Sequence, residues 1–417
     1  MNDTLWKMIH DANAEAQKRM TNARLCWTAW DTVEKLVPGI TRNTILRAGP
    51  PLPFKELTHT QQEGVINGAM LENLAETREE AKQKILSGEI RVTPGNEFGV
   101  ACSGTGIVTA SMTVNMVEDR SSGMRGFCAP FEGPNRGGMA GYGKLSDDII
   151  SYHKKMRDLI VPVFNRILQS CGGIVLDPFL RSGLAMGDEL HIRQDAATCL
   201  MTRELFFHLS EIDCTEEERD ASLEYLRISP RIFHPLDMAA GMALTASLQN
   251  IPYSTVVCAQ CGNGVIYGIR LASTGSEWFT APAPSIENPG APAGESLPWI
   301  GDSCVCEAAG WGALASAASP LSAVSVGQNA LEAIGLTKEM YEICVGRNPN
   351  FPLPALDGQG TPCGIDAQKV LERGILPALH GGRMGADGSR LGAGVARIPL
   401  ECFQKAMKRF YQKYGEN

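Results

Sequence analysis

The densest group of ionisable side chains in the sequence lies at residues 188–193. Asp188, Glu189, His191 and Arg193 occur there within one short run. An imidazole flanked by carboxylates becomes more basic, and either neighbour can fix which ring nitrogen carries the proton. Such a group suits general acid–base catalysis. It also offers the carboxylate and imidazole ligands of a divalent metal site.

The element that carries these groups is predicted to be a helix. Apolar residues recur along it at helical spacing, at Met186, Leu190, Ala197, Met201 and Leu205. This spacing is typical of a helix with one face in the core. On that helix Asp188, His191 and Asp195 would lie in line, and Glu189 would pair with Arg193. The same pattern would also fit a solvated face that carries charge pairs and no chemistry.

An anionic substrate would need local arginines or exposed amide groups, because the formal net charge of −8 provides no attracting field. Arg125 lies in a glycine-rich stretch, residues 121–143, which we expect to be a long functional loop. Ser103 and Thr105 each precede a glycine and could hold an anion. A glycine turn between strands is the simpler interpretation of that segment.

The last third of the chain contributes further candidates for binding substrate: Asn263, Asp302, Glu307 and Arg383. Asn263 closes a turn expected between two strands. Asp302 and Glu307 precede a predicted helix of small residues, where Asp302 could equally be the cap. Arg383, together with His380, is expected to be exposed in a glycine loop that follows a strand.

Length and composition limit the class of protein. A chain of 417 residues exceeds one ordinary core, and we expect a mixed α/β (α+β) fold in three parts. These are an N-terminal mixed α/β domain (1–145), a helical middle subdomain (146–250) and a C-terminal mixed α/β domain (251–417). The negative net charge and the lack of a basic stripe argue against a nucleic-acid surface.

Cysteine usage indicates a reducing compartment, the cytoplasm. The 13 cysteines show no disulfide-scaffold spacing. Cys258 and Cys261 form a CxxC, and the nearest other pair is Cys304 with Cys306. A four-thiolate zinc site is therefore expected only if the fold unites the two pairs.

The periodicity of apolar residues predicts the other elements that position these groups. Helices are expected at residues 3–36, 146–170 and 215–226, and strands at 107–117, 254–259 and 264–271. Residues 308–330 carry no charge. Because they are mostly small and include Pro320, we expect a buried helix followed by a strand there and not a membrane span.

A series of motifs runs in a consistent order along essentially the whole chain. The motifs are Arg47-Ala-Gly-Pro-Pro-Leu-Pro53, residues 183–198 around Gly-Asp-Glu-Leu-His-Ile-Arg, Trp278-Phe-Thr-Ala-Pro-Ala-Pro284, Ile300-Gly-Asp-Ser303, Glu307-Ala-Ala-Gly310, Met340-Tyr-Glu-Ile343, Gly360-Thr-Pro-Cys-Gly-Ile-Asp366, Gly374-Ile-Leu-Pro377 and Pro399-Leu-Glu-Cys-Phe403. In this order the motifs resemble a family long catalogued as a domain of unknown function, which includes the AllG (YlbE) type subunit of oxamate carbamoyltransferase and the YahG-type paralogues.

The resemblance implies a subunit of an oligomeric, multi-subunit enzyme of anaerobic allantoin degradation. The reaction would convert oxalurate and phosphate reversibly into oxamate and carbamoyl phosphate. The partners would be an acyl-CoA-synthetase-like companion subunit and a further small subunit. The Ser-Thr-Arg-Thr phosphate motif of the aspartate and ornithine carbamoyltransferases is absent from the sequence, so their site cannot be carried across.

Carbamoyl transfer needs fixed positive groups for the anions and a base for the amide proton. We expect His191 to be that base, with Asp188, Glu189 or Asp195 beside it. The anions would be held by Arg193, Arg125 or Arg383, in a pocket lined by Asn263, Asp302 and Glu307. No cofactor is assigned, and a divalent metal ion stays open. Two alternatives remain: a non-catalytic scaffold for the acyl-CoA-synthetase-like subunit, and a metal-dependent amidohydrolase.

Overall fold

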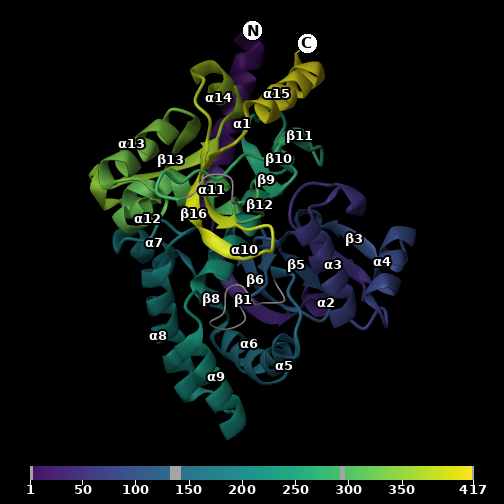
Figure 1. Ribbon diagram of the computed structural model, residues 1–417. Helices are drawn as coiled ribbons and strands as arrows, with labels where there is room; N and C mark the ends of the chain where they lie inside the picture. Colours follow the sequence, from purple (N-terminus) through teal and green to yellow (C-terminus); the bar gives the residue numbers. More distant parts are fainter. Residues whose placement is uncertain (1–2, 132–141, 292–295, 416–417) are drawn as a thin grey trace.

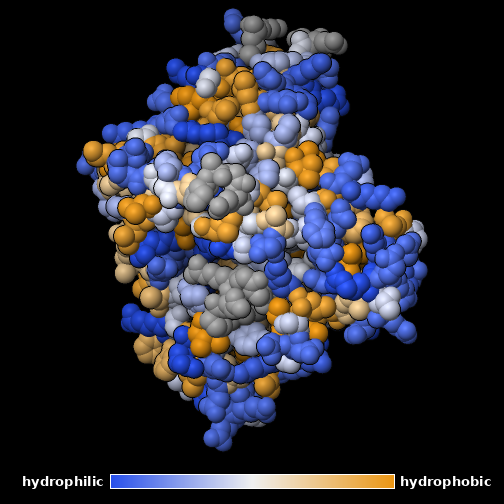
Figure 2. Space-filling model, viewed as in Figure 1, coloured by the Kyte–Doolittle hydropathy of each residue, from blue (hydrophilic) through white to orange (hydrophobic). Residues whose placement is uncertain are grey.

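The computed structural model describes residues 3–131, 142–291 and 296–415 (Figure 1). The predicted mixed α/β class is confirmed, because helices pack against several separate sheets. None of the described helices is long and apolar enough to cross a membrane. On the face shown in Figure 2, hydrophobic residues lie in small groups between hydrophilic ones.

A five-stranded sheet lies at the centre of the fold, in the order β4-β7-β6-β1-β8. Strand β1 pairs antiparallel with β6 and β8, β6 pairs antiparallel with β7, and β4 runs parallel to β7. Its strands are β1 (Leu25–Thr32), β4 (Val100–Ala101), β6 (Thr113–Asp119), β7 (Met124–Cys128) and β8 (Ile174–Val175).

The other sheets are smaller. A three-stranded sheet joins β3 (Arg91–Pro94), β2 (Thr44–Arg47) and β5 (Ile107–Thr109), and a four-stranded sheet has the order β11 (Phe279–Pro282), β10 (Ile266–Leu271), β9 (Val257–Asn263) and β12 (Ile300–Gly301). Two antiparallel pairs follow: β13 (Cys344–Leu353) with β14 (Gln359–Ile365), and β15 (Ala378–Met384) with β16 (Arg390–Arg397).

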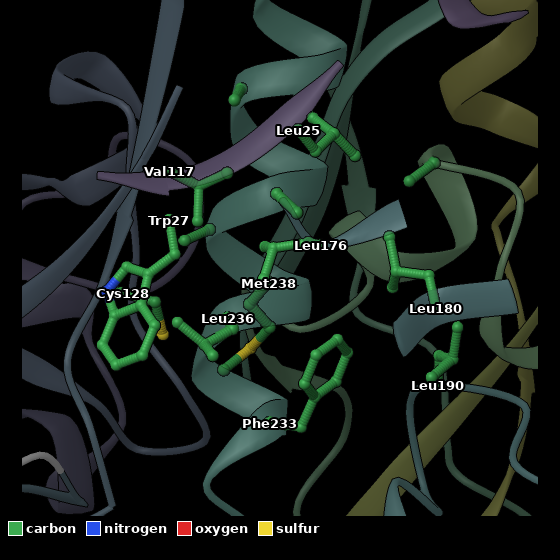
Figure 3. Close-up of a cluster of buried hydrophobic side chains, with 14 of the residues drawn as sticks. Leu25, Trp27, Val117, Cys128, Leu176, Leu180, Leu190, Phe233, Leu236 and Met238 are labelled. Atoms are coloured by element: carbon green, nitrogen blue, oxygen red, sulfur yellow. The ribbon is translucent and has the colours of Figure 1, made fainter. Parts of the chain in front are cut away.

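Helix α10 (Phe233–Ala246) packs on strands β6 and β7 of the central sheet and is buried along almost its whole length. Figure 3 shows Phe233, Leu236 and Met238 of this helix among side chains of β1, β6 and β7. Because its apolar residues surround the helix and do not form a stripe, burial on several sides is its stable environment. Its first turn therefore lies at a fixed place deep in the molecule.

The remaining helices cover the sheets. They are α1 (Asp3–Asn22), α2 (Val33–Leu36), α3 (His59–Leu71), α4 (Arg78–Ser87), α5 (Asp147–Lys155), α6 (Val161–Cys171), α7 (Asp177–Ala185), α8 (Asp195–Glu211), α9 (Glu216–Ile228), α11 (Val305–Ala308), α12 (Pro320–Ser325), α13 (Ala330–Tyr341), α14 (Ala367–Arg373) and α15 (Leu400–Tyr414). A π-helical turn, Met156–Ile160, joins α5 to α6, so the predicted helix at 146–170 is confirmed. Helix α9 confirms the helix predicted at 215–226.

Several predicted elements were wrong. The helix expected at 3–36 ends at Asn22, and β1 follows because its Trp and Thr side chains favour a strand. Residues 312–318 form a 3-10 helix followed by α12, without the expected strand. Strand β7 interrupts the loop expected at 121–143, of which residues 132–141 lie outside the described residues. Strand β9 continues to Asn263, so the turn expected to end at Asn263 instead follows that residue and precedes β10.

The three predicted domains stay a prediction. The described apolar side chains form three buried clusters. The largest contains Trp27 of β1, Phe164 of α6 and Trp311 before the 3-10 helix. Side chains from all three predicted segments therefore pack together around α10.

Candidate functional site

The acid–base group of residues 186–194 lies in a loop between α7 and α8, so the predicted continuous helix was wrong here. Gly187 has φ +100° and Leu190 has φ +68°, and these left-handed conformations cannot continue a helix. Leu190 nevertheless reaches the core, where it lies beside Leu180 (Figure 3). Leu190 of the loop and Ala197, Met201 and Leu205 of α8 do reach the core, whereas Met186 is exposed.

Because this segment is a loop, Asp188 and Asp195 do not flank His191. The Asp188 carboxylate accepts hydrogen bonds from the backbone of Ala196 (3.2 Å) and Ala197 (2.8 Å) and so caps the first turn of α8. Burial raises the pKa of Asp188. Arg193 lies 3.3 Å from Asp188 and 2.6 Å from Asp195. The in-line stripe expected from the sequence is not formed.

The partner of His191 is Glu307, whose side chain is completely buried. Nδ1 of His191 lies 2.8 and 3.0 Å from the two oxygens of Glu307. Oε1 of Glu307 also accepts the backbone N–H groups of Ala313 and His380, each at 3.0 Å. Four contacts from three separate segments therefore fix this carboxylate. They give it the role of orienting the imidazole ring.

The approach of Glu307 depends on Gly312. This glycine has φ +60°, and a Cβ there would lie 2.1 Å from Oε1 of Glu307 and 3.1 Å from Cβ of His191. A side chain at position 312 would thus occupy the space in which the pair meets. The small residues after Glu307 serve close packing around this pair.

Glu189 is also buried, but its carboxylate contacts other groups. It accepts hydrogen bonds from Ser322 and from the backbone of Ile192, and lies 3.6 Å from Nδ1 of His380. Burial by itself would raise the pKa of Glu189. The ion pair with His380 and the hydrogen bonds outweigh that effect and lower the pKa to about 2. Glu189 is therefore an anion that ties the loop to α12 and β15.

A pocket opens over His191. Residues from β15, β16, α10 and several loops form its wall: Ser103, Gly104, Tyr142, His191, Ile192, Arg231, His234, Ile300, Ser303, Gly382, Met384 and Arg390. A second depression adjoins it and shares Ile192, Arg231 and Arg390 with it, adding Arg193. The Ser103–Gly104 turn, expected only to be a possible anion loop, does line the pocket.

Two residues of this wall, Arg231 and His234, were missed in the sequence. Arg231 donates to the backbone oxygens of His191 (2.8 Å) and Ile192 (3.1 Å), and to the side-chain oxygen of Gln194. It thereby holds the loop of residues 186–194 against α10. The available signal was the Pro-bounded run Ser229-Pro-Arg-Ile-Phe-His-Pro235 directly before a helix of small residues.

Asn263 and Asp302 lie behind the pocket and not on its wall. Asn263 accepts backbone N–H groups of the β9–β10 turn. Asp302 accepts the N–H groups of Gly49 (2.8 Å) and Cys102 (3.0 Å). Burial raises the pKa of Asp302 to about 7, although these two hydrogen bonds oppose the rise. Both residues fix loops that carry pocket residues.

The remaining arginine candidates occupy different environments. Arg125 lies on the surface of β7 and pairs with Glu118 at 3.0 Å; it lines neither depression of the site. Arg383 lies on β15 and is buried, as is His380. The prediction that these two residues are exposed in a glycine loop was wrong, because β15 continues through them and pairs with β16.

Among the described residues one group has the composition and spacing of a metal site, namely His234, Asp237 and Cys306. The sequence stripe around His191 is not such a group, and neither are the four cysteines considered above. Burial raises the pKa of both the Asp237 carboxyl and the Cys306 thiol well above their ordinary values. All thirteen cysteines are unpaired.

Comparison with known proteins gives a consistent result. The family model described as oxamate carbamoyltransferase subunit AllG matches residues 90–303. The uncharacterized protein YahG of Escherichia coli K12 is 31% identical over 98% of this chain and 87% of its own length. The oxamate carbamoyltransferase subunit AllG of the same organism is 29% identical over 99% of this chain and 100% of its own length.

A solved structure has the same fold throughout. The crystal structure of a conserved protein of unknown function from Enterococcus faecalis V583 matches with a TM-score of 0.94 and 30% identity, over 98% of this chain and 99% of the other. The family match covers half of the chain, and the relatives align along nearly all of it. The chain thus belongs to the AllG family of oxamate carbamoyltransferase subunits.

Proposed function

We propose that this chain carries the active site of an oxamate carbamoyltransferase, at which a carbamoyl group moves between oxalurate and phosphate. The observation that supports the proposal is the His191–Glu307 pair, whose imidazole lines a pocket that also presents guanidinium groups. An oriented imidazole and fixed cations are what this reaction requires of a protein.

The charges of the wall suit the substrates. Oxalurate, oxamate, phosphate and carbamoyl phosphate are all anions. Arg231 and Arg390 line the pocket, and Arg193 lines the depression that adjoins it. Guanidinium groups match the geometry of carboxylate and phosphate oxygens. The Ser103–Gly104 turn adds backbone and hydroxyl groups to the same wall.

His191 is assigned the proton transfer. In the phosphorolytic direction a phosphate oxygen bonds to the carbamoyl carbon, and the bond from that carbon to the oxamate nitrogen breaks. The nitrogen keeps the electron pair and takes a proton, giving oxamate and carbamoyl phosphate. Glu307 occupies Nδ1 of His191, so Nε2 would give this proton and take it back in the reverse direction. Glu307 replaces Asp188 and Asp195 as the residue that steadies the base.

The proposed partner subunits rest on membership of the AllG family. AllG is named as a subunit, and we propose that this chain works with an acyl-CoA-synthetase-like companion and a further small subunit. If this chain were only a scaffold for the companion, the His191 pocket would have no catalytic role. The two functions therefore predict different effects of one substitution.

The test is phosphate-dependent cleavage of oxalurate by the assembled enzyme. His191→Gln should reduce kcat by roughly 10²- to 10⁴-fold, the range for loss of a general acid–base group. The matched control is His208→Gln on α8, where the ring pairs with Glu204 near the surface. Unchanged turnover in His191→Gln, with normal assembly, would support the scaffold function instead.

A further inference from the structure

One side chain of the pocket wall and two behind it form a compact group whose members come from two helices. His234 and Asp237 lie three residues apart in the first turn of α10, and Cys306 lies on α11, which packs against α10. Nδ1 of His234 lies 3.0 Å from Oδ1 of Asp237, and Sγ of Cys306 lies 3.6 Å from the same oxygen. All three residues are buried.

The protonation of this group is fixed by Gln194. Its Oε1 accepts from Arg231 and its Nε2 donates to the backbone oxygen of His191, so its amide cannot be turned over. The second hydrogen of Nε2 then faces Nδ1 of His234, at 3.0 Å. Nδ1 therefore accepts this hydrogen bond and carries no hydrogen itself, and a cation that bound Nδ1 would take its lone pair in place of the contact with Gln194.

Because Nδ1 of His234 accepts a hydrogen bond, it does not donate one to the Asp237 carboxylate. One ring nitrogen cannot accept from Gln194 and donate to Asp237 at once. Oδ2 of Asp237 is buried and has no hydrogen-bond partner within the described residues. A buried carboxylate without partners is costly. Nitrogen, oxygen and sulfur ligand atoms thus lie together here, and the Cys306 thiol lies 3.6 Å from Oδ1 of Asp237 as a donor.

We propose that His234, Asp237 and Cys306 bind one divalent cation of the zinc class. Bonds of roughly 2.0–2.3 Å from zinc to nitrogen, oxygen and sulfur place neighbouring ligands about 3–4 Å apart. The observed separations of 3.0 and 3.6 Å, with all ligand atoms within 4.8 Å of one another, agree with that spacing. A mixed imidazole, carboxylate and thiolate set favours zinc over magnesium or calcium.

Three protein ligands leave a fourth position, as in zinc sites that bind water or a substrate atom. His234 itself lines the pocket, and its ring lies 5.9 Å from that of His191. The fourth position would therefore lie next to the proposed reaction site and take an oxygen of an anionic ligand. The inference does not depend on the proposed function, since metal content is measured without substrate.

The experiment measures metal in the full chain purified without chelator, incubated with zinc and then dialysed. The wild type should hold about one zinc per chain. Cys306→Ser, His234→Gln and Asp237→Asn should each hold less than roughly a tenth of that. The matched control is Cys304→Ser on the residue that precedes α11, where the buried thiol donates to the backbone oxygen of Gln260; it should keep its zinc.

Cobalt(II) distinguishes loss of a ligand from loss of the fold. The cobalt-substituted wild type should show a thiolate-to-cobalt absorption band that is absent in Cys306→Ser, with circular dichroism unchanged. A protein that takes up neither zinc nor cobalt would overturn the proposal, and a proton on Asp237 would then satisfy its contact with Nδ1. Equal zinc in wild type and Cys306→Ser, or equal loss in Cys304→Ser, would also overturn it.

Discussion

Nδ1 of His191 lies 2.8 Å from Oε1 of Glu307, although 116 residues separate the two in the chain. Both side chains are buried, and the carboxylate is held by two further backbone N–H groups. The ring is therefore fixed in orientation before any ligand arrives. This preorganisation is the main structural support for a catalytic role of the pocket.

Glu307→Gln tests the orienting role directly. The amide keeps the shape of the side chain but removes the charge next to His191, so kcat should fall about 10- to 100-fold while KM changes little. Steady-state kinetics of the assembled enzyme measure this. Glu339→Gln is the control, because that carboxylate forms a half-exposed pair with Arg397 and should leave kcat unchanged.

Gly312→Ala should disrupt the same pair without changing its chemistry. The new methyl group would meet Oε1 of Glu307 at 2.1 Å, at a position whose φ also disfavours alanine. We expect a loss of roughly 1–3 kcal/mol in the free energy of unfolding and a lower kcat. Urea unfolding and turnover measure the two effects.

Gly335→Ala provides the contrast. Gly335 lies in α13, and a Cβ there meets nothing within 4 Å. Alanine in a helix interior should raise the free energy of unfolding by about 0.5–1 kcal/mol relative to glycine. Equal destabilisation of Gly312→Ala and Gly335→Ala would contradict a steric clash between a side chain at position 312 and Glu307.

Arg390→Ala tests the binding of anions. Arg390 lines both depressions of the site, and its Nε makes one long contact, of 3.4 Å, to the backbone of Gly392. The variant should raise KM for oxalurate or for phosphate by about tenfold, the equivalent of one charge-assisted contact. Arg409→Ala, which removes a surface pair with Glu277, should leave KM unchanged.

The lowered pKa of Glu189 predicts how the free energy of unfolding depends on pH. Its pKa is lowered from 4.5 to about 2 in the folded protein, so the unfolded chain binds more protons between these values. Its contribution, on the order of 3 kcal/mol, is present above pH 4.5 and is lost as the pH falls toward 2. Urea unfolding between pH 6 and pH 3 should show this loss. Glu189→Gln should be less stable at pH 6 and should show a shallower acid slope.

The sequence singled out two residues that the structure brings together in the candidate site, but it did not predict their contact. His191 and Glu307 were both candidates, yet nothing local pairs residues that far apart. The stripe around His191 was predicted as a helix because Leu190 continues the apolar period, whereas its left-handed φ in fact turns the loop into the core. Arg231 and His234 carry no periodic signal, since the role of each depends on which loop packs over α10.

Burial also could not be derived from the sequence where strands end. Arg383 and His380 follow a predicted strand and adjoin glycines, a pattern typical of exposed loops. In the structure the glycines lie within β15, where Gly381 makes room for Trp299. The pairing of β15 with β16 that buries these residues involves segments separated by an exposed turn.

The most direct test of the central claim is isothermal titration of the isolated full chain with carbamoyl phosphate and with oxamate. We expect that the chain alone binds these ligands, and that Arg390→Ala weakens the binding about tenfold or more while Arg409→Ala does not. Binding that appears only after the acyl-CoA-synthetase-like companion is added, and that is the same in both variants, would contradict an active site in this pocket.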